Sequence, residues 1–412
     1  MRIRHALLAA TLTTVLTACG SAMTGTALPG ETDIRALDTG SYPVEPLNAH
    51  DDDPVLPFSE RYEVAALRLA EYVIDPSTID PQMKYGTDAG TAWSTVVPYS
   101  MGMHDGMDAV AEKHTMLFGF ESGSASVDKS IYSAFDWPSK QPDNKFTANI
   151  TVLQFPDAAR AAAAAQEFYD VDFGIQQGKS QQVALSVHPT AHAHWHPDSP
   201  FLRVFMPHGS YVIAVLLSVD SPDLAALTER TESALTKQIQ ALTATAPLTQ
   251  EQILALPWDP DHVLMRTLNP DKSTSPDAAG GGYILTGKQG AVHFGTGGVL
   301  PSDRGYVDKQ LTRMEAQQVG ITNAAMVIRT PSADIADRAL TEKLFPWPVR
   351  LDTDPAPKVP DTVCVENRRS EAVERFSCLV AYKQYVGIVS SDQLLDVHQR
   401  AAAQYALFAN TR

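Results

Sequence analysis

A strand-and-helix pattern occurs twice in this chain, and this internal repeat limits the folds that the chain can adopt. In the first half, an apolar strand is followed by Pro156 and an alanine-rich helix, and a similar sequence places Pro331 175 positions later. A second strand and helix begin at Tyr211-Val212, and their counterpart begins at Tyr385-Val386, 174 positions later. Two independent pairs with almost the same offset indicate a tandem duplication. We therefore predict an α+β fold in which two copies of one domain each pack helices on one face of a sheet.

Changes in composition divide the chain into four parts. Residues 1–19 form a signal peptide. Residues 20–55 are rich in Gly, Pro, Thr and Asp and have no helical period, so they form a tether, whose part around Ile34 to Tyr42 we expect to lie against a domain. The two α+β domains then span residues 56–246 and 247–412, which is a usual size for each.

The first twenty residues have the features of a bacterial lipoprotein signal. Arg2 and Arg4 give a basic start, an apolar segment too short to span a bilayer follows, and Leu16-Thr17-Ala18-Cys19 is a small-residue cleavage site that ends in cysteine. This order matches the lipobox, which implies cleavage before Cys19 and a diacylglycerol on its sulfur. We therefore expect the mature protein on the extracytoplasmic side of the cell membrane, attached through lipid at Cys19.

Charge and hydropathy exclude two kinds of interaction. The formal net charge is −16, and the sequence has no cluster of Lys and Arg of the kind that binds phosphate backbones, so we expect no nucleic acid partner. The most apolar stretch after the signal, residues 211–219, is far shorter than a membrane-spanning helix. Membrane attachment is therefore predicted to depend on lipid alone, and the expected partner is an envelope protein or lipid.

Two cysteines remain once Cys19 is acylated. Cys364 and Cys378 flank a charged segment in a pattern of strand, hairpin tip and strand. In an oxidising envelope compartment we expect this pair to form a disulfide across the two strands. A redox-active pair is the alternative, but exchange sites usually place their cysteines two residues apart at the start of a helix.

Histidines are concentrated between residues 188 and 208. If residues 191–196 are extended, the side chains of His192, His194 and His196 point to one face, where they could bind zinc or copper together with His208. The alternative interpretation is a surface strand of neutral, hydrogen-bonded histidines beside Trp195. A separate copper hypothesis concerns residues 101–107, which combine methionine thioethers with an imidazole, although such methionines also fill gaps in cores.

Motifs for nucleotide binding and hydrolysis are incomplete. Gly282, Gly287 and Lys288 match the start of a phosphate-binding loop, but Gln289 replaces the hydroxyl residue that holds magnesium. We therefore expect no nucleotide, and instead hairpin strands at residues 283–285 and 291–294. The sequence also lacks the G-x-S-x-G and H-E-x-x-H motifs, which disfavours a hydrolase.

Several stretches are distinctive in combination: the lipobox, LDTGSYPVEP, FPDAARAAAAAQEF, HPTAHAHW and the paired late cysteines. With them the chain resembles a family of actinobacterial envelope lipoproteins, of mycobacterial and nocardial type, whose function is unknown. The resemblance covers nearly the whole mature chain. It implies a lipid-anchored, exported protein of two α+β parts, and it assigns a role to no residue besides Cys19.

Together these observations predict a non-enzymatic binding module that needs no cofactor and binds a partner protein or an envelope lipid or glycolipid. Two alternatives remain open. One is a zinc- or copper-binding lipoprotein that uses the histidines of residues 188–208. The other is a hydrolase without a recognisable motif.

Overall fold

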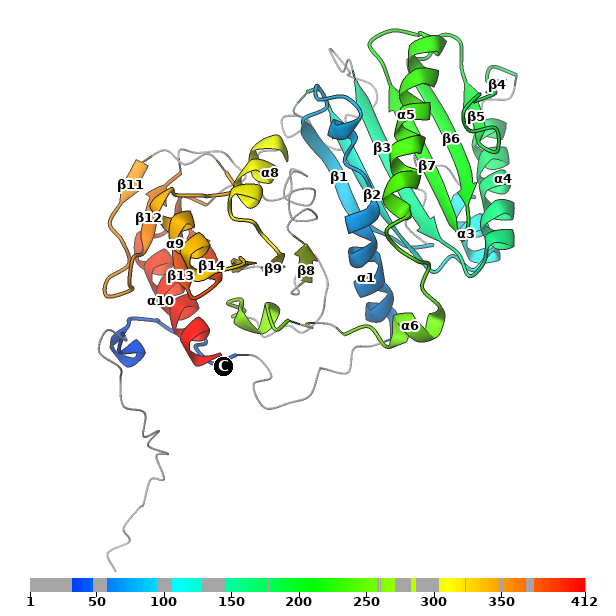
Figure 1. Cartoon of the computed structure of the whole chain (residues 1–412). Coiled ribbons are helices and arrows are strands. Elements are labelled where there is room, and N and C mark those ends of the chain that lie inside the picture. Colours follow the sequence, from blue (N-terminus) through cyan, green and yellow to red (C-terminus); the bar gives the residue numbers. More distant parts are fainter. Residues whose placement is uncertain are drawn as a thin grey trace, which may run out of the picture. The chain divides into compact units, whose positions relative to one another are not determined.

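Each copy of the repeat forms a seven-stranded antiparallel sheet (Figure 1). The strand order is β1-β2-β3-β7-β6-β5-β4 in the N-terminal sheet and, in the same sense, β8-β9-β10-β14-β13-β12-β11 in the C-terminal sheet. The two orders are equivalent, so the predicted α+β tandem duplication is confirmed. The structure is a computed structural model that describes residues 32–46, 58–94, 106–127, 146–175, 178–257, 259, 261–270, 283–286, 304–322, 324–347, 351–367 and 374–411.

The strands of the two sheets have the following bounds. The N-terminal sheet contains β1 (Tyr85–Ala92), β2 (Phe118–Ala125), β3 (Thr147–Gln154), β4 (Gln181–Val183), β5 (His192–Trp195), β6 (Phe201–His208) and β7 (Tyr211–Ser218). The C-terminal sheet contains β8 (Tyr283–Thr286), β9 (Gln318–Ile321), β10 (Ala325–Arg329), β11 (Leu351–Thr353), β12 (Val363–Glu366), β13 (Phe376–Tyr382) and β14 (Tyr385–Ser391).

Helices precede and follow these strands in both copies. They are α1 (Phe58–Leu69), α3 (Met107–Lys113), α4 (Ala158–Ile175), α5 (Leu224–Leu242), α6 (Gln250–Leu254), α8 (Arg304–Arg313), α9 (Ala333–Thr341) and α10 (Leu394–Asn410), with short 3-10 turns η1 (Ile34–Ala36), η2 (Ala70–Tyr72), η3 (Pro76–Thr78) and η6 (Leu264–Arg266). Within the described part of the chain, we find no helix with the length and apolar character needed to cross a membrane.

The pairing register agrees with the repeat seen in the sequence. Gln154, at the end of β3, lies opposite Tyr211, at the start of β7, and Arg329 lies opposite Tyr385 at the same positions of β10 and β14. These pairs differ by the offsets of 175 and 174 residues that the sequence analysis identified. The duplication therefore holds for strand register as well as for strand order.

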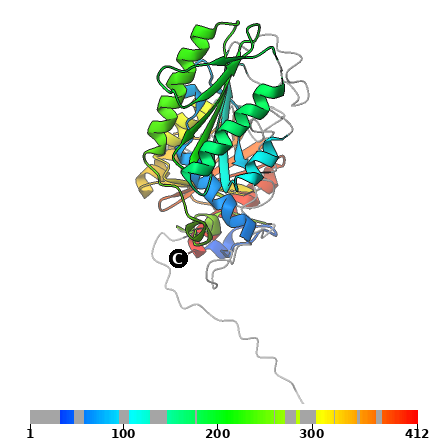
Figure 2. The same cartoon turned by 90° about the vertical axis from the view of Figure 1, so that its right-hand side faces the viewer.

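Helices cover both faces of each sheet, not one face as predicted. In the N-terminal domain, α5 packs with residues such as Ile150 and Val204 on one face, whereas α4 packs with Leu153 and Phe205 on the other. Figure 2 shows these helices on the two sides of that sheet. In the C-terminal domain, α9 and α10 cover opposite faces in the same way. The physical reason is that the central strands are buried on both sides, because neighbouring residues of β7 and β14 are nearly all apolar.

Residues 32–46, which we call the strap, pack on the C-terminal domain, although they precede the N-terminal domain in the sequence. Leu37 lies in the same apolar core cluster as the inner face of α10 and is only 8% exposed. The Tyr42 hydroxyl donates to Asp396 Oδ1 over 2.6 Å, and Asn410 Nδ2 donates to the Val44 carbonyl over 2.8 Å. The segment around Ile34 to Tyr42 thus lies against a domain, and that domain is the C-terminal one.

In each domain, a fully buried glutamine on the long helix after the last strand fixes a backbone segment. On α5, Gln238 accepts a hydrogen bond from the Ile74 N–H and donates to the Tyr72 carbonyl, over 3.0 and 2.7 Å. On α10, Gln404 makes the same pair of bonds to the Leu268 N–H and the Arg266 carbonyl, over 2.8 and 2.7 Å. In both copies the clamped backbone runs from the last residue of a 3-10 turn, η2 or η6, to the second residue after it. We refer to these two residues as the glutamine clamps.

Candidate functional site

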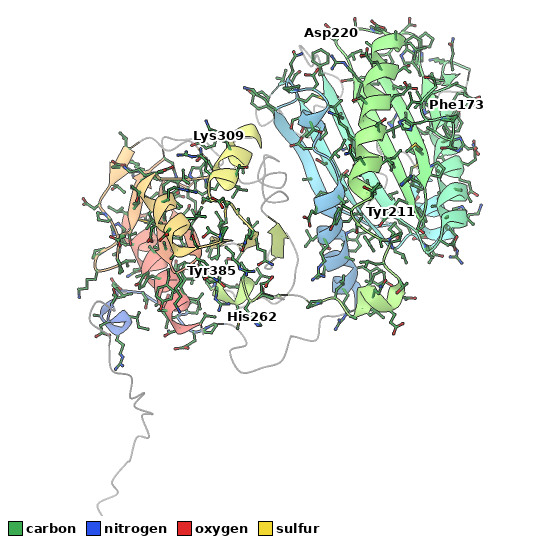
Figure 3. The ribbon with its side chains drawn as sticks, viewed as in Figure 1. Phe173, Tyr211, Asp220, His262, Lys309 and Tyr385 are labelled. Atoms are coloured by element: carbon green, nitrogen blue, oxygen red, sulfur yellow. A yellow bond between two sulfur atoms is a disulfide. The ribbon has the colours of Figure 1, made fainter. Side chains whose placement is uncertain are left out.

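The histidine-rich strand β5 lies under helix α4. His192 and His194 are two residues apart on the strand, and both rings contact Tyr169, with ring centroids 5.8 and 5.7 Å away. The His194 ring also packs against Phe173 of α4, which is labelled in Figure 3, with ring centroids 5.6 Å apart. The alternation predicted from the sequence therefore holds for these two histidines, which face α4 together.

A buried ion cluster lies next to these rings. His194 Nε2 is 2.8 Å from Asp172 Oδ2, and Arg203 Nε on β6 is 3.3 Å from the same oxygen. Asp172 is only 3% exposed and His194 only 6% exposed. A carboxylate removed from water in this way is tolerated only with charged or hydrogen-bonding partners, which His194 and Arg203 supply. We call Asp172, His194 and Arg203 the buried triad.

The neighbouring His192 is in a different electrostatic environment. Burial lowers the pKa of His192, and the negative charge of Asp170 opposes that effect only in part. The neutral ring that results packs against Tyr169 without the cost of a buried charge. His192 is therefore an aromatic packing residue of this cluster.

The other histidines of this region lie apart from the triad. His196 Nδ1 accepts the N–H of Asp198 over 3.1 Å in the turn after β5, and His208 pairs with Tyr211 in the β6–β7 hairpin. His188 Nε2 lies 2.9 Å from Thr236 Oγ1 on α5. Among the residues that the structure describes, these histidines do not form a group of three ligands around one point. The structure thus places His192 and His194 together against α4, His196 in the turn after β5, and His208 at the end of β6.

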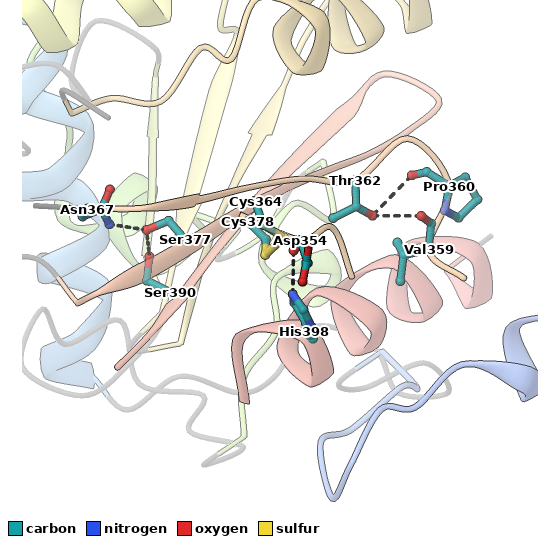
Figure 4. Close-up of a disulfide and its surroundings, with 10 residues drawn as sticks. All are labelled: Asp354, Val359, Pro360, Thr362, Cys364, Asn367, Ser377, Cys378, Ser390 and His398. Atoms are coloured by element: carbon teal, nitrogen blue, oxygen red, sulfur yellow. Dashed lines mark hydrogen bonds between the residues drawn. A yellow bond between two sulfur atoms is a disulfide. The ribbon is translucent and has the colours of Figure 1, made fainter. Parts of the chain in front are cut away.

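One group of three described residues does bring potential metal ligands within 4.8 Å of one another, namely Cys364, Cys378 and His398. Figure 4 shows that the two cysteines are joined as a disulfide, with an S–S distance of 2.03 Å. His398 Nε2 is 2.8 Å from the Asp354 carbonyl oxygen. Because both sulfurs are used in the bond, no thiolate remains to bind a metal.

The disulfide joins residues that lie directly opposite each other on β12 and β13. In the N-terminal domain, the equivalent pair on β5 and β6 is Ala193 and Val204, both fully buried. The same position is therefore filled by apolar packing in one copy and by a covalent bond in the other.

This equivalence gives a conservative test of the disulfide. We expect the double variant Cys364→Ala and Cys378→Val to fold and to lose about 3 kcal/mol of stability in the C-terminal domain, since a loop of this length is no longer closed in the unfolded chain. The measurement is urea unfolding with and without reductant. Reductant should destabilise the wild type by a similar amount and leave the variant unchanged, and a variant as stable as the oxidised wild type would contradict the prediction.

Some residues singled out in the sequence lie outside the described residues. They are Cys19, residues 101–105 of the methionine-rich segment, and Gly282, Gly287, Lys288 and Gln289 of the glycine-rich stretch. The predicted strand at residues 283–285 is present as β8, and residues 291–294 are also outside the described part.

Asp172 and Arg203 were not among the site residues predicted from the sequence. Both had a detectable signal, because each places a charge among residues that are otherwise buried, Arg203 within β6 and Asp172 on the buried face of α4. Their pairing with His194 could not be read from spacing, since α4 and β5 meet only through the fold.

Comparison with known proteins identifies the family but adds no activity. Residues 58–258 match the model described as "Domain of unknown function (DUF7373) N-terminal", and residues 263–411 match its C-terminal counterpart. No curated protein matches the chain by sequence. Among solved structures, the chain is similar to the crystal structure of the extracellular domain of PknH from Mycobacterium tuberculosis, with 11% identity over 44% of this chain and 97% of that one. The TM-score is 0.28. The two family matches together cover most of the sequence, so the chain belongs to the two-domain DUF7373 family.

Proposed function

We propose that the mature protein is an exported actinobacterial envelope lipoprotein, held by lipid on Cys19 at the extracytoplasmic side of the cell membrane. The observation that carries this proposal is the order of basic residues, apolar segment and Leu16-Thr17-Ala18-Cys19 at the start of the sequence. The disulfide between Cys364 and Cys378 supports it, because disulfides persist in oxidising compartments.

In that position the protein acts as a non-enzymatic binding module for an envelope protein, lipid or glycolipid. The buried triad is the described cluster that most resembles catalytic machinery, and its enclosure argues against that role. Asp172 is only 3% exposed and His194 only 6%, and the His194 ring packs against Tyr169 and Phe173, which leaves a substrate little access to these two side chains. The triad stabilises the domain that carries the binding surface.

Lipid attachment is tested by metabolic labelling with an alkyne fatty acid in an actinobacterial host. We expect label on the wild-type protein, recovery in the membrane fraction, and loss of both in Cys19→Ser, because the acyl chains provide the membrane affinity. A wild-type protein without label, or a Cys19→Ser variant with the same label, would contradict the proposal.

The binding role is tested on protein extracted from envelopes in mild detergent, by native mass spectrometry. A discrete mass increase from a bound lipid or protein is the expected result. Stoichiometric zinc or copper in protein purified without a histidine tag would favour the metal-binding alternative instead. Labelling by a fluorophosphonate probe would favour the hydrolase.

A further inference from the structure

The strap makes an extensive set of polar contacts with the C-terminal domain. Besides the bonds of Tyr42 and Asn410, Gln399 Nε2 donates to both carboxylate oxygens of Asp38 over 3.1 and 3.2 Å. Lys358 Nζ donates to the Ala36 carbonyl over 3.3 Å. The strap is thus bonded to the domain at several residues between Ala36 and Val44.

A charged network fixes the middle of the strap. Arg400 Nε donates to the Tyr42 hydroxyl over 3.0 Å and to Asp396 Oδ2 over 2.9 Å, and its guanidinium lies 5.5 Å from the Tyr42 ring centre. Burial favours the neutral form of Asp396, but the bonds from Tyr42 and Ser391 and the charge of Arg400 together lower its pKa. The ionised carboxylate is therefore the form that holds the strap.

The backbone of the strap also fits closely at one glycine. Gly40 has a φ of +56°, and a Cβ placed there would lie 2.7 Å from Gln399 Oε1 on α10. Gly209, in the β6–β7 hairpin, has an almost identical φ of +55°, but a Cβ there would meet no atom within 4 Å. Alanine at position 40 therefore displaces the amide end of the Gln399 side chain, which bonds Asp38, in addition to the backbone strain that alanine causes at both sites.

From these contacts we infer that the strap makes the C-terminal domain the membrane-proximal domain. This inference rests on the proposed anchor at Cys19. Cys19 and Ile34 are 15 residues apart, and a chain of that length spans at most about 54 Å in any conformation. With the strap docked, Ile34 and the part of the C-terminal domain that it contacts stay within this distance of the bilayer surface. The chain reaches the N-terminal domain only after this docking point.

Release of the strap would remove this restraint. The first described helix beyond the strap is α1 of the N-terminal domain, which begins at Phe58, 39 residues after Cys19. The longest possible distance between Cys19 and the start of α1 is then about 140 Å. The C-terminal domain would be connected to the anchor only through the N-terminal domain. Docking of the strap thus decides which domain is held near the phospholipid head groups.

The test attaches the mature chain, residues 19–412, through the Cys19 thiol to maleimide-bearing lipid in phosphatidylcholine vesicles that also contain an acceptor dye. A donor dye on an unnatural amino acid replaces Leu395, an exposed residue on α10, or Val187, an exposed residue of the N-terminal domain. Because the anchor is made chemically, a failure of this test is separate from a failure of lipidation in cells.

We expect efficient energy transfer from position 395 to the vesicle in the wild type and in Gly209→Ala. In Gly40→Ala the transfer efficiency should fall about twofold or more, because the maximum length of chain between the anchor and the first attached domain increases about 2.6-fold. Asp396→Asn provides a second strap variant. Hydrogen exchange of residues 32–46 shows whether the strap is docked, and it should be slow in the wild type and fast in both strap variants.

Two results would overturn the inference. One is rapid exchange of the strap in the wild type, or slow exchange in both strap variants, since either outcome contradicts the docked geometry. The other is a strap that is released in the variants while transfer from position 395 stays unchanged. Loss of transfer from position 187 in place of position 395 would show that the N-terminal domain is the proximal one.

Discussion

Replacement of Gln404 by leucine is expected to lower the free energy of unfolding of the C-terminal domain by about 2–5 kcal/mol. Leucine has a similar size, so the change leaves the packing nearly intact and removes only the two hydrogen bonds of the clamp. The Leu268 N–H and the Arg266 carbonyl would then be buried without a partner. Gln238→Leu should have an effect of the same size on the N-terminal domain, through the Ile74 N–H and the Tyr72 carbonyl.

The two domains act as controls for each other in this experiment. Hydrogen exchange of the Leu268 and Ile74 amides reports on the two clamps separately, and each variant should accelerate exchange in its own domain only. Gln166→Leu, on the exposed side of α4, should change stability by less than about 0.5 kcal/mol. An effect of Gln404→Leu no larger than that of Gln166→Leu would contradict the role of the clamp.

The second large effect is expected for Asp172→Ala, which should destabilise the N-terminal domain by about 3–5 kcal/mol. Removal of the carboxylate takes away the ion pair with the half-buried Arg203, and it leaves His194 Nε2 without the oxygen that it now contacts. The measurement is urea unfolding, with exchange in β5 and β6 as the local readout.

Asp170→Ala is the matched control, since Asp170 lies two residues away on the same helix and is exposed. We expect its effect to stay within about 0.5 kcal/mol. If Asp172→Ala were as mild as Asp170→Ala, the triad would be worth no more than a surface ion pair, and the structural role assigned to it would be wrong.

Much of the fold could be predicted from the sequence because the strongest signals are local. The apolar runs of β7 and β14 and the proline and aspartate residues before the helices fix these elements within short windows, as shown by Asp223, whose side chain caps α5. The constant offset between Pro156 and Pro331 then revealed the duplication. The double-sided cover of the sheets was missed because a short apolar run fits burial on one face or on two.

The glutamine clamps illustrate a limit of the repeat signal. Gln238 and Gln404 are separated by 166 residues, whereas the strands before them are offset by 174. The second copy has a shorter last strand and a shorter connecting segment, and its glutamine lies nearer the start of its helix, so alignment by a constant offset does not bring these glutamines together. Their equivalence becomes visible only from the bonds that they make.

The candidate site shows the same division between local and non-local information. Alternation along β5 correctly placed His192 and His194 on one face, and it failed for His196 because the strand ends at Trp195. Alternation carries no information on what covers a face. His194 contacts the Asp172 carboxylate on α4. Which side chain lies against His194 depends on tertiary packing, which a single sequence does not reveal.

Mass spectrometry of the amino-terminal peptide of the native protein tests the central claim most directly. The account predicts that the chain starts at Cys19 and that this residue carries a diacylglyceryl group. An unmodified peptide that begins at Met1, or a mature chain that begins beyond Cys19, would contradict it.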